Sequence, residues 1–382
     1  MRSQPERLGA IVCLLLPFAG AAHAAADEAL ILERELLMLG TRVRIQVAAA
    51  DPGSALAASE AMAGALERAE AVLSTWREDT ELARVNRAPA GVAQPIGGDL
   101  HRWLQAARLC EESTAGAFDP AVGALVDAWG LRVEGDRRRP TPEQRRRAVE
   151  TTGLGAWRLG PGSSLTRIHP RVRLEEGGFG KGAALDAAVA AGRVMSGVSG
   201  GLVDVGGQVG VWGNGAERVL LADPRDRDRP VVAVPISSGS LATSGNGVRG
   251  IVVDGRAVGH LLDPRTGEPV ADFGSLTVWA PEGLQADCLS TGLYVLGPDA
   301  ALNWAARHAG VEVLVLEPRG QRLVARASAG LVDRLEPLIA ELTVVRDAPR
   351  HHAGDSLSSS IGALVEGADL QTRPGPGPVE EN

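Results

Sequence analysis

The chain has 382 residues, enough for one large domain or two ordinary ones, and its hydrophobic content of 45% supports a buried core. Its formal net charge of −8 argues against a general nucleic-acid-binding protein. Lys181 is the single lysine among 39 Lys+Arg residues, so almost every cation of the chain is an arginine.

The first residues have the pattern of a secretory signal. Arg2 and Arg7 precede an apolar run over residues 11–22, and Ala22-His23-Ala24 supplies a cleavage pattern of small residues. The run is too short to span a bilayer comfortably. We therefore expect a signal peptide over residues 1–24 and export to a bacterial periplasm, with retention as an uncleaved anchor as the alternative.

Two cysteines remain after such a signal, Cys110 and Cys288. Their spacing excludes a cysteine-rich metal site. In an oxidising compartment they can form a disulfide, and they can equally remain as buried free thiols. The sequence leaves both states open.

The hydrophobic pattern predicts secondary structure along most of the chain. Leu39-Gly40-Thr41 stands at the entry of a strand over 42–47, and Ser54 is the expected N-cap of a helix over Ser54–Leu73. Asp254-Gly255 predicts a hairpin turn between its flanking strands. Further helical patterns cover residues 100–114, 122–129, 183–195, 284–296 and 300–309, and further strand patterns cover residues 201–205, 209–212, 219–222, 231–236, 251–253, 257–262, 275–280, 311–316 and 322–327.

The order of these elements predicts the fold class. Strands and helices mix without strict βαβ alternation, which favours an α+β fold with mixed or antiparallel sheets and packed helices. The strands at 311–316 and 322–327 are expected to close the sheet. Residues 132–147 are so charged that we expect a solvated loop and a short helix there. The folded domain is expected over residues 25–345, and residues 346–382 have the Gly-, Pro- and Ser-rich composition of a disordered tail.

The stretch from Arg173 to Asp186 surrounds Lys181 with glycines and leads into an apolar helical run. Glycines allow backbone N–H groups to approach a ligand closely, and a helix N-terminus attracts anions. Lysine differs from arginine in offering a compact ammonium rather than a planar fork. The stretch therefore predicts an anion-binding loop, with chance survival of one lysine as the alternative.

Known phosphate loops fit this stretch poorly. A Walker A loop requires a glycine and a hydroxyl where Glu175 and Gly182 stand. Gly178, Gly180 and Ala183 match the spacing of a dinucleotide fingerprint, but a buried strand should precede it and the preceding residues are too charged. A Rossmann domain is therefore only a minor alternative.

A metal site is suggested by Asp287 and Thr291, which are four residues apart and share one helix face. A carboxylate and a hydroxyl suit Mg²⁺, which takes few protein ligands alongside substrate phosphates. Helix capping by the aspartate is the alternative. The polar segments 243–246 and 260–267 are further candidates for site residues. A turn is the structural alternative for the first, and a strand ending in an Asp-Pro turn is the structural alternative for the second.

Taken together and in order, these segments resemble the ApbE-like family of FAD:protein FMN transferases. The matching pieces are Leu39-Gly40-Thr41, Ser74–Asn86, Gly116–Gly130, Glu175–Asp186, Val205-Gly206-Gly207, Thr243-Ser244-Gly245, His260–Gly267 and Ala286–Thr291. The resemblance covers residues 39–326, nearly all of the expected domain. It implies the family's T-fold-like α+β architecture.

The resemblance also implies an activity. The family transfers the FMN half of FAD to a Ser or Thr hydroxyl of an exported flavoprotein, uses Mg²⁺ and releases AMP. The implied acceptor is an exported protein such as a respiratory redox subunit, through which this chain would associate with the inner membrane. The alternatives are an Mg²⁺-dependent FAD pyrophosphatase, which would use water as the acceptor, and a non-catalytic FAD-binding protein.

The resemblance assigns roles to individual residues. The implied metal donors are the carbonyl of Gly178 with Asp287, Ser290 and Thr291. Lys181 is expected to hold phosphate oxygens, and His260 and Asp263 are candidates for the proton acceptor. The implied FAD contacts are Leu39, Ser74, Thr75, Trp76, Ala117, Phe118, Asp119, Glu175, Lys181 and Leu262.

Three positions depart from the family pattern. Glu175 replaces the usual aspartate and is followed by Glu176 in place of an apolar residue. Leu39 replaces a methionine. Asn246 stands where an aromatic residue usually follows Thr-Ser-Gly.

Overall fold

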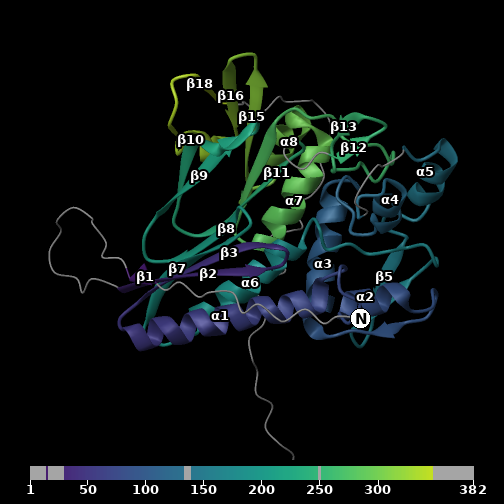
Figure 1. Ribbon diagram of the computed structural model, residues 1–382, viewed down its shortest axis with the longest axis horizontal. Helices are drawn as coiled ribbons and strands as arrows, with labels where there is room; N and C mark the ends of the chain where they lie inside the picture. Colours follow the sequence, from purple (N-terminus) through teal and green to yellow (C-terminus); the bar gives the residue numbers. More distant parts are fainter. Residues whose placement is uncertain (1–13, 16–29, 133–138, 248–250, 347–382) are drawn as a thin grey trace, which may run out of the picture. The chain divides into compact units, whose positions relative to one another are not determined.

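The computed structural model describes residues 14–15, 30–132, 139–247 and 251–346 (Figure 1). The predicted signal peptide, apart from residues 14–15, and residues 347–382 of the predicted tail lie outside the described residues. Arg346, the first residue of the predicted tail, is the last residue of a strand. Within the described residues, no helix has both the length and the apolar character needed to cross a bilayer.

A ten-stranded sheet dominates the described part of the chain. All of its neighbouring strands are antiparallel except the last two, which are parallel. In spatial order the strands are β1 (Leu14–Leu15), β2 (Leu30–Met38), β3 (Thr41–Ala49), β7 (Val198–Val205), β8 (Gln208–Gly213), β11 (Gly239–Gly245), β14 (Ser275–Ala280), β15 (Glu312–Arg319), β16 (Arg322–Ala327) and β18 (Leu342–Arg346).

Helices cover one face of this sheet. Figure 1 shows α1 (Pro52–Leu73) and α6 (Gly180–Arg193) beneath β2, β3 and β7. Helix α7 (Gly283–Leu296) packs against α6, β11 and β14, and α3 (Gly98–Ser113) packs against α7. The main hydrophobic core lies between these helices and the sheet, where Val43, Ile45 and Val47 of β3 are fully buried at every second position.

A smaller sheet covers part of the other face. Its strand order is β17 (Glu336–Pro337), β10 (Asp226–Ile236) and β9 (Glu217–Asp223). A second core forms here, so β15 is buried on both sides: Val313 and Val315 join the helical core, whereas Leu314 and Leu316 join the second core. This double cover explains why the central strands are apolar throughout.

The remaining elements are short and surround these layers. They are α2 (Glu81–Arg87), α4 (Gly123–Ala128), α5 (Pro142–Val149), α8 (Pro298–Ala305) and α9 (Ala329–Val332), a three-stranded sheet of β4 (Gln94–Pro95), β6 (Ser164–Arg167) and β5 (Trp157–Gly160), and the hairpin of β12 (Ile251–Val253) and β13 (Arg256–Val258).

The predicted α+β fold is confirmed, with local corrections. The cap of α1 is Asp51 rather than Ser54, because Asp51 accepts the Ser54 N–H at 3.0 Å and Pro52 sets the first helical turn. In the part of the large sheet within residues 30–346, β2, β11 and β18 were not predicted, and Thr243, Ser244 and Gly245 lie in β11 rather than in a turn. Strand β16 does not close the sheet because β18 lies beside it. Residues 171–177 form no strand, which excludes the Rossmann alternative.

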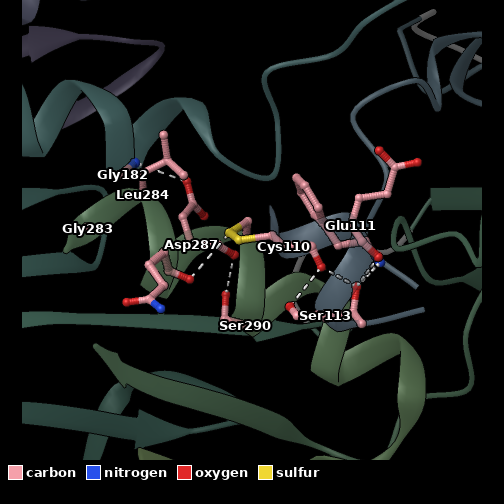
Figure 2. Close-up of a disulfide and its surroundings, with 12 residues drawn as sticks. Cys110, Glu111, Ser113, Gly182, Gly283, Leu284, Asp287 and Ser290 are labelled. Atoms are coloured by element: carbon pink, nitrogen blue, oxygen red, sulfur yellow. Dashed lines mark hydrogen bonds between the residues drawn. A yellow bond between two sulfur atoms is a disulfide. The ribbon is translucent and has the colours of Figure 1, made fainter. Parts of the chain in front are cut away.

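Cys110 of α3 and Cys288 of α7 form a disulfide (Figure 2). The alternative of two buried free thiols is therefore wrong. The bond joins positions 178 residues apart in the sequence and connects two helices of the main core.

Candidate active site

A cavity of about 360 Å³ lies where the large sheet, the smaller sheet and two helices meet. Strand β11 pairs with β8 at Gly239, Ser240 and Leu241, and then continues beside the cavity as residues 242–245 while it remains paired with β14. The residues used below that line the cavity are Gly177, Lys181, Gln208, Ser244, His260, Asp287 and Thr291.

Lys181 lies in the first turn of α6 and points to α7. Its Nζ is 2.9 Å from Oδ1 of Asp287, and the other carboxylate oxygen accepts the Gly182 N–H at 3.1 Å. Asp287 is only 3% exposed. The aspartate thus joins the glycine-rich start of α6 to the middle of α7, and each of its oxygens retains a lone pair for a further partner.

Glycine is required at position 182 for this arrangement. A Cβ there would lie 2.2 Å from the carbonyl oxygen of Gly283 and 2.6 Å from the Cα of Leu284. Because both obstacles are backbone atoms, no side-chain rotation could relieve the contact. The glycines therefore set the close approach of α6 and α7 that brings Lys181 to Asp287.

Asp186 fixes the start of α7 from one turn further along α6. Its carboxylate accepts the N–H groups of Gly283 at 2.6 Å and Leu284 at 2.8 Å. Burial raises the pKa of Asp186 to about 6, against the opposing effect of these two hydrogen bonds. In the same turn of α7, the Gly283 carbonyl accepts a hydrogen bond from the side-chain amide of Gln208 at 2.8 Å.

Three of the four predicted metal donors, Gly178, Asp287 and Thr291, lie close together at the cavity. Asp287 and Thr291 both line the cavity, and a Cβ on Gly178 would lie 3.3 Å from the Thr291 hydroxyl oxygen. Ser290 is engaged differently: its hydroxyl donates to the Asp287 carbonyl at 2.9 Å and lies 2.9 Å from the Ser244 hydroxyl. Ser290 therefore ties α7 to β11.

The donor chemistry of this group fits Mg²⁺. The carboxylate of Asp287, the hydroxyl of Thr291 and the backbone carbonyl of Gly178 are hard oxygen donors, and Mg²⁺ is usually held by few protein groups. In the described part of the chain there is no cluster of three or more His, Cys, Asp and Glu residues that could hold a metal by themselves. Such a sparse set does not suit zinc, which takes nitrogen and sulfur ligands.

A polar cluster surrounds the segment 74–76 after α1. Thr75 donates its N–H to Glu176 at 3.1 Å and its hydroxyl to the same carboxylate at 2.5 Å. Arg132 pairs with Glu175, bonds to Thr75 and lies 4.8 Å from the centre of the Trp76 ring. Burial raises the pKa of Glu175 to about 7, although Arg132 opposes that shift. Trp76 is 70% exposed.

Leu39 lies in the turn between β2 and β3 with a φ of +53°, followed by Gly40 at +66°. This backbone region is strained for a leucine and costs roughly 1–3 kcal/mol. Thr41, at the end of this hairpin turn, lies beside Gly206, which lines the cavity. A Cβ on Gly206 would be 2.5 Å from the Thr41 hydroxyl oxygen, so the hairpin adjoins the cavity wall. The strain therefore lies next to the cavity.

The segment 117–119 supports the site mostly through packing. The Phe118 ring lies between Gly178 and α7, since a Cβ on Gly178 would be 3.1 Å from Cε2 of the ring and a Cβ on Gly292 would be 2.8 Å from the Phe118 Cβ. Asp119 is buried and accepts the N–H groups of Ala121 at 2.7 Å and Gly153 at 2.5 Å. Its carboxylate thus stabilises local loops.

The segment 260–263 divides between the cavity and its support. His260 lines the cavity, whereas Leu262 packs in a separate small core with Leu125 and Trp129. Asp263 pairs with Arg265, with both contacts at 2.9 Å. Asn246 holds this segment in place by accepting the Leu261 N–H at 3.1 Å.

The chain matches the ApbE family over residues 39–315. It belongs to this family. Among curated relatives, FAD:protein FMN transferase of Treponema pallidum is 29% identical over 89% of this chain and 98% of its own length. The protein of the same name from Klebsiella pneumoniae is 31% identical over 74% of this chain and 83% of its own.

Solved ApbE structures have the same fold. A Thermotoga maritima ApbE protein superimposes with a TM-score of 0.69 at 28% identity, covering 75% of this chain and 94% of the other. The flavinyl transferase ApbE of Pseudomonas stutzeri gives a TM-score of 0.69 at 24% identity, covering 84% and 97%. The architecture of this ApbE-family chain is therefore established on both sequence and structure.

Sequence reasoning missed some residues of this candidate site. Arg132 belongs to a run that we interpreted as solvated loop, yet its side chain is only 22% exposed and binds Thr75 and Glu175. Asp186 and Gln208 had no motif of their own. Their only signal was position, at the end of the glycine-rich stretch and directly after Gly206-Gly207.

Proposed function

We propose that this protein is a Mg²⁺-dependent FAD:protein FMN transferase, which moves the FMN half of FAD to a Ser or Thr hydroxyl of an acceptor protein. The observation that carries the proposal is the convergence of Lys181, Asp287, Thr291 and the Gly177–Gly178 loop at one cavity. The names of the curated relatives support the same activity.

The reaction is a phosphoryl-type transfer. The acceptor hydroxyl oxygen forms a bond to the FMN-side phosphorus of FAD, the bond from that phosphorus to the AMP phosphate oxygen breaks, and AMP leaves. The hydroxyl proton passes to a base. Such transfers depend on positioning and on stabilising the charge of the phosphate oxygens rather than on covalent chemistry by the protein.

Lys181 is assigned to the pyrophosphate oxygens. Its ammonium lies at the N-terminal turn of α6, where backbone N–H groups also favour an anion. Asp287 orients this ammonium at 2.9 Å, and fixed donors of this kind contribute about 10²–10³-fold to a rate. Asp287, Thr291 and the Gly178 carbonyl would hold Mg²⁺, which neutralises charge on the pyrophosphate when bound.

His260 is assigned as the proton acceptor. Of the two sequence candidates it is the one that lines the cavity, whereas Asp263 is paired with Arg265. Asp263 then holds the loop after His260. The cluster of Thr75, Trp76 and Glu175 with Leu39 is assigned to binding FAD, together with Ala117–Asp119 and Leu262.

The expected setting is the periplasm, after export through the predicted signal peptide. The acceptor is then an exported flavoprotein, and association with the inner membrane would come through that acceptor. The pairing of Cys110 with Cys288 is consistent with an oxidising compartment.

The test is direct. Purified protein is incubated with FAD, Mg²⁺ and exported proteins of the host, and covalent flavin is detected by fluorescence in a denaturing gel. We expect a labelled band that disappears when Lys181→Met replaces the wild type. Free FMN and AMP without a labelled band would instead indicate a pyrophosphatase, and retained FAD without product would indicate a binding protein.

A further inference from the structure

The Cys110–Cys288 disulfide lies directly beside the proposed metal site. Cys288 follows Asp287 in α7 and is fully buried, and Cys110 of α3 is 5% exposed. Figure 2 shows the sulfur–sulfur bond between the two helices, with Asp287 and Ser290 beside it. The bond therefore fixes α3 to the same helical turns that carry Asp287 and Thr291.

Other contacts hold the start of α7. Asp186, Gln208 and the glycine contact at position 182 all act on Gly283 and Leu284, at the start of the helix. These contacts come from α6 and β8. The disulfide is the covalent link from α3, and it acts one turn further along α7, near the metal donors.

The end of α3 also supports the third donor, Gly178. The Cys110 carbonyl accepts the Thr114 hydroxyl at 2.7 Å, and the Thr114 oxygen accepts the Phe118 N–H at 3.1 Å. The Phe118 ring in turn packs against Gly178 and Gly292. Cys110 is thus connected to the donors of α7 through the disulfide and to Gly178 through Thr114 and Phe118.

We propose that this disulfide is a positioning element, which sets the distance between the Gly178 carbonyl and the donors Asp287 and Thr291. The inference rests on the proposed function for the identity of the metal. When the bond is reduced, two electrons and two protons convert it to two thiols, and the covalent limit on the separation of α3 and α7 is lost. The apolar packing of the two helices remains, so the fold persists while the donor geometry loosens.

The experiment compares the oxidised protein with protein reduced by a phosphine that is then removed under anaerobic conditions. Mn²⁺ affinity of the FAD-loaded protein is measured by electron paramagnetic resonance of free Mn²⁺, without any acceptor present. Cys110→Ala removes the bond genetically. Leu323→Ala, a fully buried site in the second core, serves as the control for lost stability.

We expect reduction and Cys110→Ala each to weaken Mn²⁺ binding by about tenfold, the lower range for a lost supporting contact. FAD affinity without metal should change less than twofold. Leu323→Ala should keep the wild-type Mn²⁺ affinity. Reoxidation of the reduced protein should restore its Mn²⁺ affinity. Equal Mn²⁺ affinity in both redox forms would overturn the inference, as would a protein purified without reductant that lacks the Cys110–Cys288 peptide link by mass spectrometry.

The two proposals fail separately. A protein whose Mn²⁺ affinity follows its redox state but that labels no acceptor would refute the transferase and leave the positioning role intact. Labelling with the same Mg²⁺ dependence in both redox forms would refute the positioning role and leave the transferase intact.

Discussion

Replacing Gly182 by alanine tests the geometry that joins α6 to α7. The added Cβ would lie 2.2 Å from the Gly283 carbonyl oxygen, whereas ordinary van der Waals contact begins at 3.4 Å. The two helices must therefore separate by about 1.2 Å at this point, because only backbone atoms are in the way. That movement stretches the 3.1 Å hydrogen bond from the Gly182 N–H to Asp287.

The expected cost has two parts. Overpacking of this kind destabilises a protein by about 1–3 kcal/mol, partly offset by roughly 1 kcal/mol from the better helix propensity of alanine. A shift of about 1 Å in a catalytic group lowers a rate by about 10²-fold. We expect Gly182→Ala to reduce flavin labelling by about that factor while most of the folded state is retained.

The assays are in-gel flavin fluorescence for the rate and urea denaturation for stability. Gly98→Ala is the matched control, since Gly98 is also helical and nothing lies within 4 Å of its added Cβ. It should label at the wild-type rate and be slightly more stable. A Gly182→Ala protein with wild-type labelling and stability would refute the close contact of the two helices.

Four further outcomes follow from the site. Lys181→Arg should label as poorly as Lys181→Met, about 10²–10³-fold below wild type in the gel assay, because a planar fork cannot replace a compact ammonium. Asp287→Asn should raise the Mg²⁺ concentration for half-maximal labelling at least tenfold in a metal titration. Removal of metal with EDTA should abolish labelling, and added Mg²⁺ should restore it, while bound FAD remains detectable by its fluorescence. Burial raises the pKa of Glu175 to about 7, that of Asp186 to about 6, and that of Glu111, a buried residue of α3, to about 8. Each of these carboxyls binds its proton more tightly in the folded state, so urea midpoints should fall as pH rises from 5 to 8, and Glu175→Gln should flatten part of that fall.

Regular elements with clear periodicity were predictable. The strands Ser275–Ala280 and Arg322–Ala327 have the predicted bounds, and the turn at Asp254-Gly255 joins β12 to β13 as its sequence indicates. Strand β2 was missed because its turn to β3 contains Leu39 in a left-handed conformation, which no turn rule anticipates for a leucine.

The edge of the sheet was harder to predict for a different reason. In β18 the side chain of Leu342 is the buried one, and the other residues are exposed or half-buried. Hydrophobic periodicity is weak in such a strand. Its pairing with β16 is parallel and depends on the intervening chain folding back, which local sequence does not encode.

The candidate site was predictable where a motif carried it. Lys181, His260, Asp287 and Thr291 were named from the sequence, and all four line the same cavity. Arg132 was missed because a run of charges usually marks a solvated surface, and only tertiary packing brings this arginine to Glu175.

The partial pairing of β11 shapes one wall of the cavity. Beyond Leu241 the strand keeps β14 on one side and presents its other edge to the cavity, so part of the wall consists of peptide groups. The spacing of those donors and acceptors is set by the pleat of the strand and not by side-chain identity. Side chains along this wall can then vary while the peptide groups keep their spacing, which suits a fold shared with the relatives named above, which are 24–31% identical to this chain.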